Sequence, residues 1–109
     1  MRVTIPLGPS VNAMYRHKGH FVYKTKEAKD WIKECLPKLK KFKKLKAPYE
    51  IDLFFYYARD FDVDNRIKAC LDLLQEAELI DNDMNILAIA AHKYQDKEQP
   101  RVEMVVYEV

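Results

Sequence analysis

Two short acidic segments contain the residues whose types and spacing suit catalysis. The first segment, residues 60–65, reads DFDVDN, and the second, residues 81–83, reads DND. In an extended chain, residues i and i+2 share a face, so Asp62 and Asp64 can direct their carboxylates to one place. Carboxylates that leave water positions open suit Mg²⁺ or Mn²⁺, and such an ion promotes phosphodiester hydrolysis. If the two segments converge, the sequence predicts a divalent-metal site built from Asp62, Asp64, Asp81 and Asp83, with Lys68 neutralising charge in the transition state.

Two other interpretations of these acids remain open. In the structural one, Asp64 caps a helix and the other acids only decorate turns, where Asp is common. An EF-hand calcium loop is less consistent, because its sixth position is Asn65 instead of Gly and its twelfth is Leu71 instead of Glu. A helix of about 20 Å separates the two segments, so they meet only if the chain doubles back.

Charge is unevenly distributed along the chain, although its formal net charge is only +2. Residues 16–46 contain twelve Lys and Arg against three Asp and Glu, whereas residues 50–86 contain ten Asp and Glu against three Lys and Arg. A basic surface beside an acidic metal site is what a phosphodiester substrate requires. The alternative is that the lysines form only a solvated helix face.

The pattern of apolar residues predicts an α+β fold, in which a small mixed β-sheet has helices packed on one side. Strands are expected at residues 2–7, 21–24, 49–57, 85–94 and 101–109, with the last two forming a hairpin. One helix begins after Thr25, which is expected to cap it, and Pro37 either kinks this helix or starts a second short helix carrying Leu39, Phe42 and Leu45. Another helix begins near Asp64, which is expected to cap it.

Length and composition exclude several classes of protein. A chain of 109 residues, 49% hydrophobic and 33% charged, fits one globular domain over residues 1–109 and is neither disordered nor a coiled coil. Its apolar runs are too short to cross a bilayer and it shows no signal peptide, so a cytoplasmic location is expected. Cys35 and Cys70 lack the spacing of a disulfide framework or a zinc site.

Two stretches of the chain resemble the signatures of one known family. Residues 62–74 read DVDNRIKACLDLL and residues 79–86 read LIDNDMNI, which resembles the D-x-D-N-x-x-K-x-x-x-D-x-L…D-D-x-x-[VI] signature of RusA-type Holliday junction resolvases. The opening stretch, residues 6–17, reads PLGPSVNAMYRH and is similar to that family's P-x-x-P-S-x-N-x-x-Y-R-H opening. The resemblance covers nearly the whole chain and implies a RusA-like fold.

The resemblance implies a homodimeric, Mg²⁺-dependent endonuclease, with Mn²⁺ as a substitute, that cuts four-way DNA junctions by paired nicks in recombination and repair. Such enzymes are typical of bacteria and their prophages. By this resemblance, Asp62, Asp64 and Asp83 are the metal-binding catalytic carboxylates, Lys68 lies near the scissile phosphate and Asn65 supports the site. Charge and the opening signature suggest the following residues for DNA contacts: Asn12, Tyr15, Arg16, Lys18, Lys24 and Lys26.

The chain departs from the family signature at two positions. The Asp-Asp pair falls on Asn82 and Asp83, so either Asp81 substitutes for the first acid or Asp83 suffices, and the helix-ending Gly falls on Glu78. A dimer also follows from the substrate, because a four-way junction has approximate two-fold symmetry and this chain offers one acidic cluster. Two further functions stay open: a non-catalytic module that binds branched DNA, and a metal-dependent nuclease with less structural selectivity.

Overall fold

The computed structural model describes the backbone of all 109 residues and the side chains of all except Val11 and Asn12. Its elements follow the order β1 (Arg2–Pro6), α1 (Val11–Met14), β2 (Tyr15–Lys18), β3 (Phe21–Lys24), α2 (Lys26–Leu39), β4 (Tyr49–Tyr57), α3 (Asp64–Glu76), the 3-10 helix η1 (Asp83–Asn85), β5 (Ile86–Gln95) and β6 (Arg101–Glu108). Among the described residues, no helix has both the length and the apolar character needed to cross a membrane.

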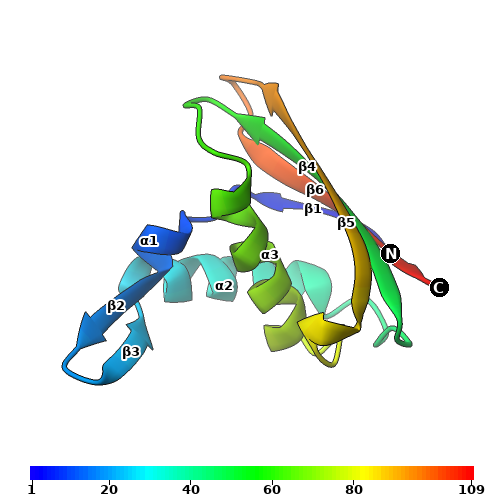
Figure 1. The fold of residues 1–109 in the computed structure, drawn as a ribbon. Helices are drawn as coiled ribbons and strands as arrows, with labels where there is room; N and C mark the ends of the chain where they lie inside the picture. The colour runs from blue at the N-terminus through cyan, green and yellow to red at the C-terminus, as the bar shows by residue number, and fades with distance from the viewer.

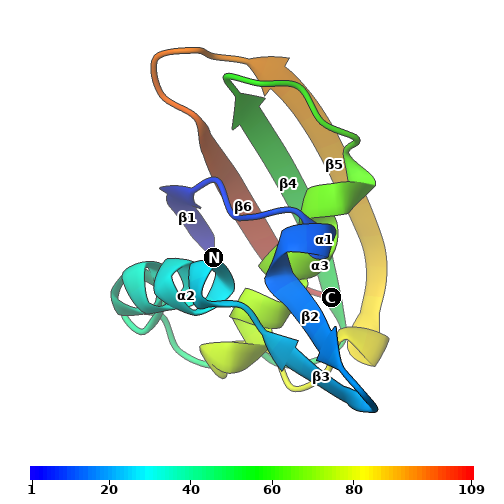
Figure 2. The same ribbon diagram turned by 90° about the vertical axis from the view of Figure 1, so that its left-hand side faces the viewer.

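A mixed four-stranded sheet forms one layer of the molecule, in the order β1-β6-β4-β5. Strand β4 pairs with β5 in parallel and with β6 in antiparallel orientation, and β1 pairs antiparallel with β6. The helices lie on one face of this sheet, and the small β2–β3 ribbon lies beyond them (Figures 1 and 2). The predicted α+β fold with a mixed sheet and helices on one side is therefore confirmed.

The core lies between the sheet and helices α2 and α3. Strand β4 alternates as predicted, and the side chains on its helix-facing side are at most 1% exposed at Tyr49, Ile51, Leu53 and Phe55. Helix α3 buries four residues against the core: Ala69, Cys70, Leu73 and Leu74. Each large apolar side chain contributes roughly 1.5–3 kcal/mol when buried, so this layer fixes how β4 and α3 pack against each other.

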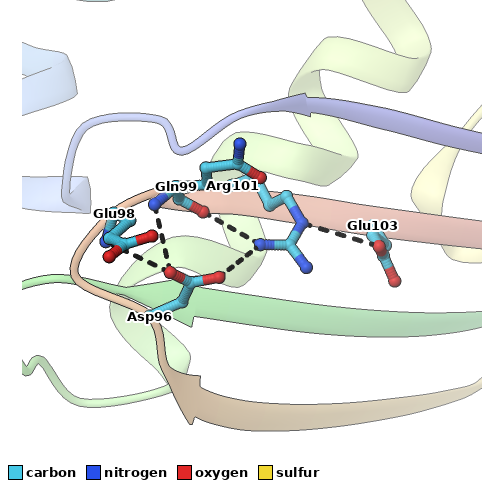
Figure 3. Close-up of polar contacts among 5 residues, drawn as sticks. All are labelled: Asp96, Glu98, Gln99, Arg101 and Glu103. Carbon is cyan, nitrogen blue, oxygen red and sulfur yellow. Dashed lines mark hydrogen bonds and ion pairs between the residues drawn. The ribbon is translucent and has the colours of Figure 1, made fainter.

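The predicted hairpin of the last two strands is wrong, because β4 lies between β5 and β6. The β4–α3–β5 segment is a parallel crossover that places β5 on one side of β4, and β6 then pairs on the other side. Residues 96–100 carry the chain across the end of β4, where the Asp96 N–H donates to the Tyr57 carbonyl at 2.8 Å. The Asp96 carboxylate accepts from the backbone N–H groups of Glu98 and Gln99 and from Arg101, which fixes this crossing (Figure 3).

The two long helices begin close to the predicted positions, but only α2 has the predicted cap. The Thr25 hydroxyl accepts from the Ala28 N–H at 3.2 Å and caps α2 as expected. Pro37 lies inside the last turns of α2, so no second helix follows it. The cap position of α3 is Val63, with no side-chain capping bond, so the prediction that Asp64 caps the helix is wrong. The Asp64 carboxylate is consequently exposed in the first helical turn.

The segment between β1 and α2 contains the predicted strand at residues 21–24 and two elements that were not predicted, α1 and β2. Ser10 caps the four-residue helix α1, and β2 and β3 pair through a turn in which Gly19 has a φ of +62°. The Trp31 ring of α2 packs on this segment, since its Nε1 donates to the Pro6 carbonyl at 2.9 Å. A Cβ at Gly8 would lie 2.7 Å from the Trp31 ring, so only glycine fits against it.

Candidate nuclease site at the two ends of helix α3

Asp60, just after the end of β4, forms an ion pair with Lys93. Lys93 of β5 donates to the Asp60 carboxylate at 2.8 Å and to the Phe61 carbonyl at 2.6 Å. The hydrogen bond from Lys93 keeps the pKa of Asp60 below its usual value, and the same bond raises the pKa of Lys93. The Phe61 ring packs edge-on against Phe55 and Tyr57, which anchors the loop. Asp60 therefore stabilises the approach to the site and lies outside the pair Asp62 and Asp64.

Asp62 and Asp64 present exposed carboxylates at the start of α3. Neither forms an ion pair with any side chain that the structure describes. The Asn65 N–H donates to the Asp62 carbonyl at 3.0 Å, and this turn fixes the spacing of the two acids. Asp62, Asn65 and Lys93 line a shallow hollow together. Lys93 was not identified from the sequence, since its partner Asp60 is more than thirty positions away.

Lys68, Asp72 and Tyr15 form a network beside these acids. Lys68 Nζ lies 3.5 Å from Asp72 Oδ1 and 5.8 Å from the centre of the Tyr15 ring. The Tyr15 hydroxyl donates a short hydrogen bond to Asp72 Oδ2. Burial, followed by the contact with Asp72, raises the pKa of Tyr15 to about 12. The four-residue spacing between Lys68 and Asp72 is a sequence signal for their pairing, whereas the hydrogen bond from Tyr15 depends on the fold.

The second acidic segment offers one carboxylate with no ion-pair partner. Asp81 pairs closely with Lys44, and its N–H donates to the Tyr49 hydroxyl at 3.3 Å. The Asn82 side chain accepts from the Met84 N–H at 2.9 Å and so caps η1. Asp83 is exposed and has no salt bridge to a described side chain.

The structure places the two acidic segments at opposite ends of α3 (Figure 1). Asp62 follows the end of β4, whereas Asp83 precedes the start of β5, and these two strands are parallel neighbours. A helix of 13 residues, about 20 Å long, separates the segments. Within the part of the chain that the structure describes, no three His, Cys, Asp or Glu residues gather closely enough to hold a metal ion. The convergence considered from the sequence does not occur within one chain.

The residues suggested for DNA contacts lie on the β2–β3 ribbon and at the start of α2. Arg16 and Lys18 are exposed on β2. Lys24 lies 3.7 Å from Glu76, and Lys26 lies 4.0 Å from Asp30. The side chain of Asn12 is outside the described part of the structure. Lysines of α2 add to this basic surface, since the following residues line one open groove: Lys24, Lys29, Ile32, Lys33, Leu36, Pro37, Lys40 and Glu76.

Strand β5 forms an open edge of the sheet. It runs for ten residues and, among the strands that the structure describes, pairs only with β4, so no described strand lies on its other side. Apolar side chains are exposed along it, including Leu87 at 63%, Ile89 at 40% and Tyr94 at 45%. Long exposed edge strands favour pairing with another strand.

Comparison with known proteins identifies a family. The family model described as Endodeoxyribonuclease RusA matches residues 5–107. No curated protein matches the chain. The matched region includes both acidic segments, the Lys68–Asp72–Tyr15 network and the β2–β3 ribbon. Since the match covers nearly the whole chain, the protein belongs to the endodeoxyribonuclease RusA family.

Proposed function

We propose that this protein is a Mg²⁺-dependent endonuclease that resolves four-way DNA junctions by paired symmetric nicks, acting as a homodimer. The chain belongs to the endodeoxyribonuclease RusA family, and three exposed carboxylates support this proposal. Asp62, Asp64 and Asp83 are all exposed and have no ion-pair partner among the described residues. Other acids near them, Asp60 and Asp81, are held by lysines.

The donor set of Asp62, Asp64 and Asp83 fits a hard divalent cation, because all three supply carboxylate oxygens. The lysines that pair with nearby acids bind Asp60 and Asp81, so they do not compete with a cation for these three carboxylates. Mn²⁺ accepts the same ligands and substitutes for Mg²⁺. When bound, such an ion activates water and stabilises the leaving oxygen of a phosphodiester. Asp81 is a weaker candidate, since its carboxylate pairs with Lys44.

A homodimer paired through β5 would bring the two acidic segments together. In an antiparallel pair related by two-fold symmetry, the start of one strand lies beside the end of the other. Asp83 precedes β5, and the end of β5 lies beside the end of β4, which Asp62 and Asp64 follow. Each site would then combine Asp62 and Asp64 of one protomer with Asp83 of the other, and a dimer would contain two such sites for the two cuts.

The remaining residues of the network orient the substrate. Lys68 lies one helical turn after Asp64, where its ammonium stabilises negative charge that develops on the scissile phosphate. The contact with Asp72 holds Lys68 in this position, and Tyr15 in turn holds Asp72. Asn65 supports the turn that positions Asp62. The basic residues of the ribbon and α2, including Arg16, would contact phosphates.

The test is cleavage of a labelled four-way junction and of a matched linear duplex, read on denaturing gels with Mg²⁺, Mn²⁺ or EDTA. We expect the wild type to nick only the junction, and only with a metal ion. Asp64→Asn and Asp83→Asn should each bind the junction without cutting it. Equal cutting of the duplex would indicate a less selective nuclease, and junction binding without any cutting would indicate a binding module.

Mixing the two inactive variants tests the shared site directly. A mixed dimer of Asp64→Asn and Asp83→Asn has one site that lacks both acids and one site that is intact. Random mixing should therefore restore nicking to about a quarter of the wild-type rate. If each chain instead contained its own complete site, every site in the mixture would lack one acid and the mixture would stay inactive. That result would contradict the shared site.

A further inference from the structure

The β2–β3 ribbon has two faces with different surroundings. Residues directly opposite each other in an antiparallel pair share a face, and the pairs are Tyr15 with Lys24 and His17 with Val22. Tyr15 contacts Asp72 and Lys24 contacts Glu76, and both of these acids belong to α3. This face of the ribbon is therefore the one anchored to the body of the protein.

The opposite face of the ribbon, which we call the outer ribbon face, consists of Arg16, Lys18, Phe21 and Tyr23. Its aromatic side chains are unusually exposed, at 77% for Phe21 and 49% for Tyr23. Each aromatic residue lies directly across the ribbon from a cation, since Lys18 pairs with Phe21 and Arg16 with Tyr23. The ribbon projects from the body on the side away from the sheet (Figures 1 and 2).

This combination of residues fits a nucleic-acid strand with unpaired bases. A planar aromatic ring can stack on any of the four bases, while a nearby cation contacts the phosphate of the same nucleotide. A fully paired duplex covers the faces of its bases, so it offers no such stacking. The charge of the segment that contains the ribbon, with twelve basic residues between positions 16 and 46, complements the phosphates.

The base of the ribbon is joined to the catalytic residues. Tyr15, the first residue of β2, donates to Asp72, which pairs with Lys68 one turn after Asp64. A DNA strand that passes the start of α3 can therefore continue along the ribbon without leaving the protein. The ribbon is about 13 Å long at its spacing per residue, enough for one or two nucleotides.

We propose that Phe21 and Tyr23 stack on bases whose faces are uncovered at the crossover of branched DNA, and that this stacking supplies part of the selectivity for junctions over duplex. The proposal rests on the proposed function and adds a means of recognising the branch. Phosphate contacts alone attract duplex and junction arms alike, whereas base faces are open to a stacking side chain only where the helix is interrupted.

The experiment measures binding in EDTA to a four-way junction with 2-aminopurine beside the crossover, and to a matched duplex. Phe21→Ala and Tyr23→Ala should each weaken junction binding roughly tenfold, the effect expected for one lost stacking contact, and leave duplex binding within about twofold. Both should also reduce the fluorescence change of the 2-aminopurine. Phe21→Trp keeps an aromatic ring and should bind as the wild type does.

The matched control is Val22→Ala, because Val22 lies on the same strand, is 58% exposed and points to the other face. It should change neither affinity by more than about twofold. Normal junction binding by Phe21→Ala and Tyr23→Ala, an equal loss for junction and duplex, or an equal loss in Val22→Ala would overturn the proposal. A change in sedimentation coefficient in Phe21→Ala would also overturn it, since the face would then be a contact between copies of the chain.

Failure of this proposal can be distinguished from failure of the proposed function. If the wild type cuts junctions and the two alanine variants bind them normally, only the stacking role is wrong. If the wild type neither binds nor cuts junctions in preference to duplex, the proposed function is wrong as well.

Discussion

The two ends of helix α3 are both acidic, but they differ in which of their carboxylates pair with other side chains. At the start, Asp62 and Asp64 have no ion-pair partner among the described residues, whereas Asp72, two turns further along the helix, is shared by Lys68 and Tyr15. At the end, Lys44 holds Asp81, Asn82 caps η1, and only Asp83 remains exposed without such a partner. The number of acids in a segment is therefore a poor guide to the number available for a metal ion.

The largest expected difference is between the two acids at the end of α3. Asp83→Asn should lower junction cutting by roughly 10²-fold or more, because it removes a carboxylate that we propose binds the metal ion. Asp81→Asn should lower it less than about tenfold, since its charge is already balanced by Lys44. Single-turnover cleavage under matched Mg²⁺ would measure both, and equal losses would show that Asp81 also acts at the site.

The proposed dimer, in which two β5 strands pair and bring together opposite ends of α3 from the two protomers, can be tested at the middle of β5. Ala90 is exposed there, and in a two-fold pair of β5 strands its two copies come close together. Ala90→Glu should therefore weaken the dimer by like-charge repulsion and lower cutting about tenfold at low protein concentration, with recovery at high concentration. Ala90→Ser is the control, and sedimentation velocity would measure the assembly. Unchanged sedimentation and cutting would argue against pairing through β5.

One tyrosine hydroxyl contacts an aspartate within α3 and another contacts an aspartate beyond its end, and the two should differ in their effect on stability. Tyr49 is fully buried, and its hydroxyl donates to the Leu45 carbonyl at 3.1 Å and accepts from the Asp81 N–H. Tyr49→Phe leaves both groups without this partner and should cost about 1–3 kcal/mol in the free energy of unfolding. Tyr15→Phe should cost about 1 kcal/mol, because water can replace its more accessible hydroxyl. Urea unfolding of the two variants would rank them, and a larger loss for Tyr15→Phe would reverse this comparison.

The end of α3 also contains local backbone strain that its start lacks. Glu78 has a φ of +60°, and the Glu78 and Leu79 N–H groups donate to the carbonyls of Gln75 and Leu74 in the helix-ending pattern that favours glycine. Glu78→Gly should raise the free energy of unfolding by about 1 kcal/mol. Glu76→Gly, at the last residue of the helix, should instead lower it, because glycine disfavours the helix and the ion pair with Lys24 is lost. Thermal melts of both would show whether the gain depends on the left-handed position.

The smallest expected effect is a difference in alkaline titration. The pKa of Tyr15, raised to about 12 from 10.0, means that the folded protein holds this proton more tightly than the unfolded chain. The contribution of Tyr15 to stability is thus present below pH 10 and is lost as the pH rises through 12. Absorbance of tyrosinate in the wild type minus Tyr15→Phe should show a phenol titrating near pH 12. A difference spectrum centred near pH 10 would contradict the contact with Asp72.

Sequence predicted the parts of the fold in which local pattern and burial agree. Strand β4 alternates between core and outer face over its length, and Thr25 precedes a helix whose apolar residues recur at helical spacing, so both were found. The hairpin was wrong because residues 96–100 suit a turn, whereas pairing with β4 determines where β5 and β6 lie. The helix α1 is too short for a periodic signal.

The candidate site was predictable in residue type but not in arrangement. Spacing and family resemblance selected Asp62, Asp64 and Asp83 as acids of interest, and their roles stay predictions. The sequence indicates a helix between these acids, but whether the chain doubles back depends on the direction of β5 relative to β4, which no local pattern reveals. The contact of Tyr15 with Asp72 spans 57 positions and required the fold to be seen.

The contact of Trp31 with Gly8 and the Pro6 carbonyl gives the protein a built-in optical probe. Trp31 is the only tryptophan in the chain and is 6% exposed, and it lies against the segment that leads into α1 and the β2–β3 ribbon. Detachment of that segment would admit water to the indole and shift its emission to longer wavelength. Intrinsic fluorescence can therefore report on the ordering of the ribbon during DNA binding, without a label and separately from any measurement of cleavage.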